Sequence, residues 1–252
     1  MTDPILCEVA DGIARITLNR PDRLNAFDVE AAGEWTRIAT EVVARDDVRV
    51  VLLSGSGRAF CAGGDVRSMT EQGFDGGSLT ELAGLINRGQ LALLESSIPV
   101  VAAAHGSTAG GGLGILLTSD YAVVGRSSKI GCIYARVGLT PDLTVSALLA
   151  RAVGERRALQ LVVSDRMLSA QEALDWGLVA EVVDDDEVPA RAEAVARAIA
   201  DHAPGARGEA KRLVRSGGDR SLAESLEDEA RTIGRAIGTP DAQTLIAAFV
   251  GG

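Results

Sequence analysis

The stretch IPVVAAAHGSTAGGGLGILLTSDYAV, residues 98–123, contains the pattern that decides the fold. It begins with a largely apolar run at 98–106, passes through three consecutive glycines and returns to an apolar run at Tyr121. Uninterrupted runs of β-branched and other apolar residues are typical of strands that are covered on both faces. We therefore predict a buried strand at 98–106, a glycine-rich turn that leads into a helix, and two further short strands within 121–131.

The residues before this stretch continue the same pattern. VRVVLLSGSG (48–57) predicts another buried strand, and ILCEVADGIARITLNRP (5–21) predicts a hairpin around Asp11-Gly12. Residues 28–45 have helical spacing, with Ala31, Trp35, Ile38 and Val42 on one face. Buried strands that alternate with helices indicate an α/β fold.

The residues after about 142 are mostly helical in character. One short strand is predicted there, at 178–184, and the predicted helices are 143–152, 155–163, 169–176, 186–202, 205–215 and 221–236. The chain is thus predicted to have an α/β body over residues 1–200 and a helical C-terminal region over 201–252. The glycine- and acid-rich segment EQGFDGGS (71–78) is expected to form a mobile loop.

Composition excludes several classes of function. The formal net charge of −10 argues against a nucleic-acid or anionic-membrane surface, and no apolar run approaches the length of a membrane span. The N-terminus lacks the basic start and apolar stretch of a signal peptide, and Cys7, Cys61 and Cys132 form no paired motif, so we expect a reduced, cytoplasmic protein. With only two histidines in the chain, a zinc site is not favoured.

Two glycine stretches, RAFCAGGDV (58–66) and GSTAGGGLGILLTSD (106–120), each follow a predicted strand where a helix begins. The first N–H groups of a helix have no partner within the helix, and glycine lets a ligand approach the backbone closely. Both stretches could be plain tight turns. Converging at adjacent strand ends, they could instead form an oxyanion hole. Neither matches a phosphate-binding nucleotide loop.

These motifs occur in the order seen in one known family. LNRPDRLNAF (18–27), GRAFCAGGDV (57–66), the 98–123 stretch, GLTPD (138–142) and the segment 148–183 together resemble the crotonase superfamily, the enoyl-CoA hydratase/isomerase family. The resemblance implies a crotonase fold, with a spiral core of repeated ββα turns and a C-terminal helical region that forms a homotrimer or a dimer of trimers. It also implies a coenzyme A thioester as substrate, without cofactor or metal.

The resemblance also implies site residues. The two oxyanion-hole donors fall on the N–H groups of Gly64 and Gly111. The segments implied to contact the substrate contain Arg23, Leu24, Ala26, Ala62, Gly63, Asp65, Val66 and Gly110. Phe249 matches an aromatic residue near the family's C-terminus, but the basic stretch that commonly follows it is missing, which leaves arginines such as Arg23 and Arg67 to bind the coenzyme A phosphates.

Hydratases of this family carry two glutamates, and the matching positions here are Gly114 and Tyr134. Ordinary hydration is therefore in doubt, since a two-carboxylate mechanism needs both groups. Asp142, in GLTPD, matches a position where several branches of the family place a functional aspartate. It could instead only cap the predicted helix that follows. Tyr134 could donate a hydrogen bond, line the acyl pocket or simply pack as an aromatic.

Other polar residues are weaker candidates. Glu71 and Asp75 could reach an acyl chain from the 71–78 loop. Structural roles are expected for His105 and Asp120, and a position on the surface or at a trimer interface for Arg136. An aromatic at 134 is shared with the 4-chlorobenzoyl-CoA dehalogenases, but the histidine of that branch falls on Asn87.

The expected activity is therefore double-bond isomerisation, with Asp142 shuttling the proton and the Gly64 and Gly111 amides holding the thioester oxygen. The alternatives are a hydratase or lyase with a relocated carboxylate, and an acyl-CoA-binding subunit that has lost the chemistry.

Overall fold

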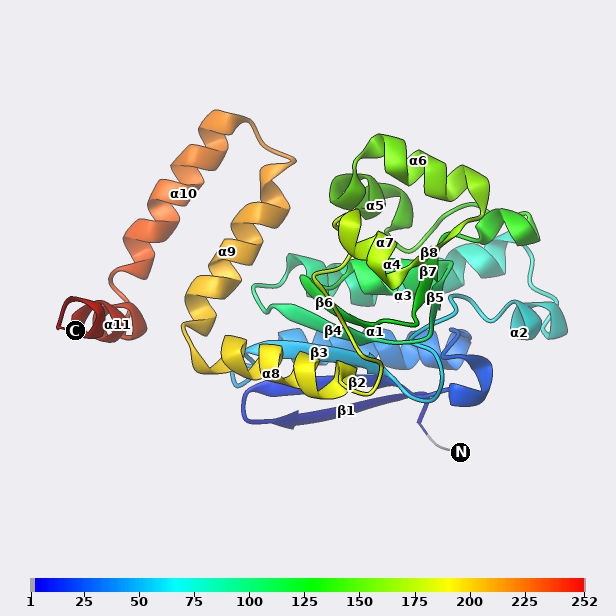
Figure 1. Cartoon of the computed structure of the whole chain (residues 1–252), viewed down its shortest axis with the longest axis horizontal. Helices are drawn as coiled ribbons and strands as arrows, with labels where there is room; N and C mark the ends of the chain where they lie inside the picture. Colours follow the sequence, from blue (N-terminus) through cyan, green and yellow to red (C-terminus); the bar gives the residue numbers. More distant parts are fainter. Residues whose placement is uncertain (1–2, 252) are drawn as a thin grey trace.

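The computed structural model describes residues 3–251 and is built around two β-sheets (Figure 1). The larger sheet has the strand order β1-β2-β3-β4-β6-β9, and only the β1–β2 pair in it is antiparallel. Its strands are β1 (Ile5–Ala10), β2 (Ile13–Leu18), β3 (Val50–Gly55), β4 (Val100–Ala104), β6 (Tyr121–Gly125) and β9 (Glu181–Val183). The smaller sheet, in the order β5-β7-β8, consists of β5 (Ser107–Ala109), β7 (Lys129–Gly131) and β8 (Met167–Ser169).

Successive turns of the chain divide their strands between the two sheets. β4 belongs to the large sheet, β5 follows it into the small sheet, and α4 (Gly111–Leu117) completes the turn. β6 and β7 repeat the step, followed by the short helix η2 (Tyr134–Val137) and α5 (Val145–Val153). This is the spiral of ββα turns expected from the sequence, and it brings the ends of several strands to one edge.

Both faces of the large sheet are covered, because alternate side chains of a strand point to opposite faces. Val50 and Leu52 of β3 pack with α8 (Val188–Asp201), whereas Val51 and Leu53 lie in the larger core with α1 (Val29–Val43). α1 in turn packs along α3 (Gly76–Glu95). The near-continuous apolar strands in the sequence follow from this two-sided burial.

The remaining helices are η1 (Pro21–Arg23), α2 (Val66–Glu71), α6 (Glu155–Ser164), α7 (Ala170–Asp175), α9 (Pro204–Gly217), α10 (Leu222–Ala236) and α11 (Pro240–Gly251). α10 and α11 extend away from the body, with α9 between them and the sheets (Figure 1). Of the helices within residues 3–251, none is long and apolar enough to span a bilayer.

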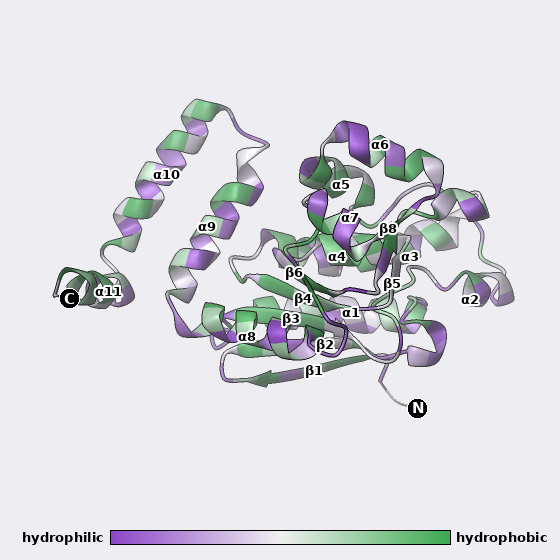
Figure 2. Ribbon diagram, viewed as in Figure 1, coloured by the Kyte–Doolittle hydropathy of each residue, from purple (hydrophilic) through white to green (hydrophobic). Residues whose placement is uncertain are grey.

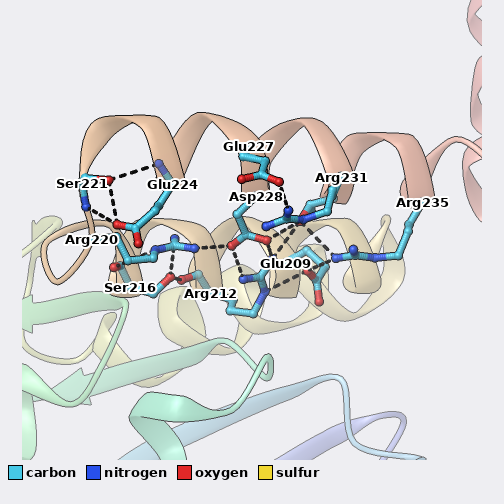
Figure 3. A network of polar contacts seen from close by, with 11 residues as sticks. Glu209, Arg212, Ser216, Arg220, Ser221, Glu224, Glu227, Asp228, Arg231 and Arg235 are labelled. Atoms are coloured by element: carbon cyan, nitrogen blue, oxygen red, sulfur yellow. Dashed lines mark hydrogen bonds and ion pairs between the residues drawn. The ribbon is translucent and has the colours of Figure 1, made fainter.

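An ion-pair network joins α9 to α10 (Figure 3). Arg212 of α9 lies 2.7 Å from Asp228 of α10, and Arg220 pairs with the same carboxylate. Elsewhere on α10 and its C-cap residue, the helical spacing gathers an exposed apolar stripe, here called the α10 stripe: Leu222, Leu226, Ile233 and the C-cap Ile237. Figure 2 shows hydrophobic and hydrophilic segments alternating along α10.

The structure corrects several predictions about the elements. Only residues 72–75 form a loop between α2 and α3, because Asp75 accepts a hydrogen bond from Ser78 N at 2.8 Å and starts α3 at Gly76. The predicted mobile loop at 71–78 is therefore wrong for its second half. The strand predicted at 178–184 is confined to β9, and β5 and β8 were not predicted. α11 lies within the predicted helical C-terminal region, in which no separate helix is predicted after residue 236.

Candidate active site

The two glycine stretches meet beside a cavity of about 430 Å³. Cys61 forms a β-bridge with Thr108 of β5, so the segment that follows β3 runs beside β5. A Cβ atom at Gly63 would lie only 2.8 Å from Gly111 N, so the two stretches are in direct contact. Gly64 and Gly111 both line the cavity, as the oxyanion-hole prediction requires.

Both glycines line the cavity, and among the described residues neither of their N–H groups donates a hydrogen bond in the structure. The bridge between Phe27 and Gly64 uses the carbonyl of Gly63 and the N–H of Asp65, so the N–H of Gly64 points the other way. Gly111 is the first residue of α4, and its N–H has no partner within that helix. Two backbone donors at one cavity wall can stabilise an oxygen that gains negative charge.

Most of the cavity wall is apolar. α2 contributes Val66 and Met69, and α3 contributes Leu79 and Ala83. Leu139 lines the opening and is 38% exposed. No local sequence signal marks the α3 residues as cavity-lining, since they come from a helix whose position depends on tertiary packing. The cavity therefore suits an apolar group attached to a polarisable carbonyl.

Asp142 and Tyr134 form a hydrogen-bonded pair in the cavity wall. The Tyr134 hydroxyl donates to Asp142 Oδ1 at 2.5 Å, and the tyrosine is 9% exposed. Burial raises the pKa of Asp142 above its ordinary value, while the bond from Tyr134 acts in the opposite direction. Burial and the neighbouring carboxylate raise the pKa of Tyr134, so the phenol stays protonated and remains a donor.

The alternative role of Asp142 as a helix cap is wrong. α5 begins at Val145, and the residue in the N-cap position is Thr144, whose side chain makes no capping bond. The side chain of Asp142 lines the cavity instead.

Of the substrate-binding residues implied by the resemblance, Ala62, Val66 and Gly110 line the cavity. Leu24 lies beside it, as Leu24 O accepts a hydrogen bond from Ala62 N at 3.0 Å. Ala26 is buried and directly precedes Phe27, which forms a β-bridge with Gly64. Gly63 contacts the Gly111 backbone, and Arg23 is exposed in η1.

Two of the implied residues are placed differently. The Asp65 carboxylate is occupied, because it caps α2 through Ser68 N and pairs with Arg20 at 3.1 Å. Phe249 is 88% exposed on α11, at the opposite end of the molecule from α2 (Figure 1). Within this chain, the structure does not bring Phe249 to the cavity.

Three residues that the sequence marks as weaker candidates, Glu71, Asp75 and Arg136, have other partners in the structure. Glu71 pairs with Arg67 at 2.9 Å, and the bond from Ser78 that caps α3 lowers the pKa of Asp75. Neither carboxylate lines the cavity. Arg136 is exposed at the cavity opening and donates to Asp165 O at 2.7 Å.

Two structural predictions are confirmed. His105 Nε2 bonds Gly57 O at 2.7 Å, and Asp120 accepts a hydrogen bond from Val100 N at 2.8 Å. Asn87, the position of the dehalogenase histidine, is exposed on α3 and does not line the cavity.

Known proteins resemble this chain in sequence and in fold. The family model for enoyl-CoA hydratase/isomerase matches residues 8–251. The chain is 33% identical to 1,2-epoxyphenylacetyl-CoA isomerase of Escherichia coli K12, covering 91% of this chain and 88% of that protein. It is 32% identical to (E)-benzylidenesuccinyl-CoA hydratase of Thauera aromatica, covering 80% of this chain and 78% of that protein. The crystal structure of an enoyl-CoA hydratase from Bacillus anthracis superposes with a TM-score of 0.93 at 28% identity, over 98% of this chain and 96% of that one. The chain therefore belongs to the enoyl-CoA hydratase/isomerase family of the crotonase superfamily.

Proposed function

We propose that this chain is an acyl-CoA isomerase that moves a double bond by proton transfer, using no cofactor. One observation carries the proposal. Among the described residues, Asp142 is the only carboxylate that lines the cavity containing the Gly64 and Gly111 amides. A single carboxylate can take a proton from one carbon and return it to another, whereas the family's hydration mechanism uses two.

The chemistry follows from the charge that develops. Removing a proton from the acyl chain turns the thioester carbonyl into an enolate, and each backbone donor aimed at that oxygen is worth about 3–4 kcal/mol in comparable sites. Burial raises the pKa of Asp142 towards the pH at which a general base works best. Tyr134 holds Oδ1, which leaves Oδ2 to carry the proton.

The apolar wall formed by Met69, Leu79 and Ala83 supports an apolar acyl group as the substrate. Two similar proteins, the isomerase of Escherichia coli and the hydratase of Thauera aromatica, are named for aryl-substituted acyl groups. We also propose a homotrimer or a dimer of trimers, and the exposed α10 stripe supports contact with further copies of the chain.

Hydration is the second candidate, because similar proteins include hydratases. Asp142 would then act on water as the sole base, and the product would distinguish the two reactions. Crotonyl-CoA loses its conjugated absorbance on hydration, whereas a 3-enoyl-CoA gains conjugated absorbance on isomerisation.

The test is Asp142→Asn assayed with both thioesters. We expect gain of conjugated absorbance from the 3-enoyl-CoA in the wild type, and a loss of turnover of about 10²-fold or more in the variant with coenzyme A binding retained. Glu71→Gln, which removes a carboxylate outside the cavity, is the matched control and should keep wild-type turnover. Unchanged turnover in Asp142→Asn would refute the assignment. Binding without either reaction would indicate a non-catalytic binder.

A further inference from the structure

A tightly packed turn follows Asp142. Leu143 has φ of +48° and Thr144 has φ of +72°, so two consecutive residues other than glycine adopt the left-handed conformation. Such residues cost free energy and persist only where their surroundings hold them, and they are concentrated at active sites. Leu143 is 3% exposed, and its neighbours Asp142 and Thr144 are partly buried.

Several contacts hold this turn in place. Gln90 of α3 is fully buried, and its Nε2 donates to Leu143 O at 3.2 Å and to Thr118 Oγ1 at 3.0 Å. Thr144 Oγ1 donates to Gly114 O at 3.3 Å. The turn is therefore bonded to both α3 and α4.

The same turn touches the oxyanion donor. A Cβ atom on Gly111 would lie 2.6 Å from Leu143 Cδ1, so the leucine side chain packs directly against that glycine. Leu143 thus contacts the residue that supplies one donor and directly follows the residue proposed as the base.

Gly114 provides the space for the turn. A Cβ atom on Gly114 would lie 1.8 Å from the carbonyl oxygen of Leu143 and 2.8 Å from its carbonyl carbon. Both are backbone atoms of a buried residue, so they cannot move aside as a flexible side chain would. Any side chain at position 114 must displace Leu143 and, with it, the adjacent Asp142.

We infer that Gly114 and Gln90 are positioning residues for Asp142. The missing side chain at 114 admits the Leu143 carbonyl, and the Gln90 amide bonds that carbonyl, so together they fix the turn that directs Asp142 into the cavity. This inference rests on the proposed function. In this account Gly114 does more than replace a hydratase glutamate, because its lack of a side chain is required to position Asp142.

The test compares Gly114→Ala with Gly33→Ala, a glycine of α1 at which a Cβ atom meets nothing within 4 Å. We expect kcat of Gly114→Ala to fall by about 10²-fold, the effect of misplacing a catalytic group by about 1 Å, while KM changes by less than about 3-fold. Gly33→Ala should keep both constants. Gln90→Met removes the hydrogen-bond donor to Leu143 O, so the turn that positions Asp142 is held less firmly. We expect this variant to lower kcat by about 10-fold.

The double variant Gly114→Ala/Asp142→Asn tests whether Gly114 acts on turnover through Asp142. If Gly114 acts through Asp142, the double variant is no slower than Asp142→Asn alone. Wild-type kcat in both Gly114→Ala and Gln90→Met, or an additive loss in the double variant, would overturn the inference. Wild-type turnover in Asp142→Asn would instead overturn the proposed function, so the two failures are distinguishable. If Gly114→Ala does not fold, Gln90→Met still provides the test.

Discussion

Replacing Lys211 with methionine tests how α9 is attached to the body. The Lys211 ammonium donates to Leu93 O at 2.8 Å and Ile98 O at 2.7 Å, and lies 3.2 Å from Asp120 Oδ2. Its side chain is only 4% exposed. Methionine keeps most of the buried aliphatic volume and removes the charge, so the variant isolates the polar contacts.

The structure sets the expected magnitude. Removing one partner of a buried ion pair typically costs about 3–5 kcal/mol because the other charge is left uncompensated. Here Asp120 keeps Arg215 at 2.8 Å, and Leu93 O keeps a bond from Ser96 Oγ at 2.9 Å. We therefore expect a smaller loss, about 2–3 kcal/mol in the free energy of unfolding.

Urea unfolding of the wild type, Lys211→Met and Arg215→Met measures this loss. Arg215 pairs with the same carboxylate, but its side chain is 27% exposed, so the control should lose about 1 kcal/mol or less. A Lys211→Met variant within about 0.5 kcal/mol of the wild type, or a larger loss in Arg215→Met, would refute this account.

The pH dependence gives a second readout. Burial lowers the pKa of Lys211, so between that lowered value and the ordinary lysine pKa the unfolded chain binds more protons than the native one. The lysine's contribution to stability therefore rises with pH across this window, and the methionine variant should lack that rise.

Two further predictions concern the pair in the cavity and the α10 stripe. Tyr134→Phe removes the hydrogen bond that lowers the pKa of Asp142, so the acid limb of the kcat/KM profile should move to higher pH. A pH–rate profile of the variant measures this shift, and an acid limb that does not move would contradict the proposed pairing. Ile233→Glu places a charge in the α10 stripe and should reduce the mass in analytical ultracentrifugation to that of one chain, with an unchanged circular dichroism spectrum. An unchanged mass would count against the stripe as a contact between copies.

Elements with local signals could be predicted from the sequence. The hairpin at Asp11-Gly12 follows from two adjacent residues that adopt positive φ, at +54° and +74°. The loop predicted at 71–78 fails in its second half because Asp75 caps a helix whose buried face, with Leu82 and Ile86, lies further along the chain. β5 and β8 are three residues long, too short for a periodic pattern, and are fixed by pairing with β7.

The site divides in the same way. The two glycine stretches could be singled out because each follows a predicted strand, whereas Gly64, Gly111 and Asp142 are named individually through the resemblance to a known family. The hydrogen bond from Tyr134 to Asp142 depends on how the chain folds between them, through η2 and the residues 138–141 that follow it. Gly114 lies in α4 and Leu143 in the turn before α5, 29 positions further along the chain, so no local sequence pattern predicts their contact.

The packing of Leu143 restricts how this site could evolve. One residue touches the glycine that offers a donor and follows the residue that offers a carboxylate, so the two halves of the site cannot be altered independently. A glutamate introduced at 114 would displace the turn carrying Asp142 while position 134 still held a tyrosine. A lineage that changed these positions one at a time would therefore pass through an intermediate with neither the present Asp142 site nor a complete two-glutamate site. Such a change requires the turn and both positions to be replaced together, which makes the present arrangement hard to leave by single substitutions.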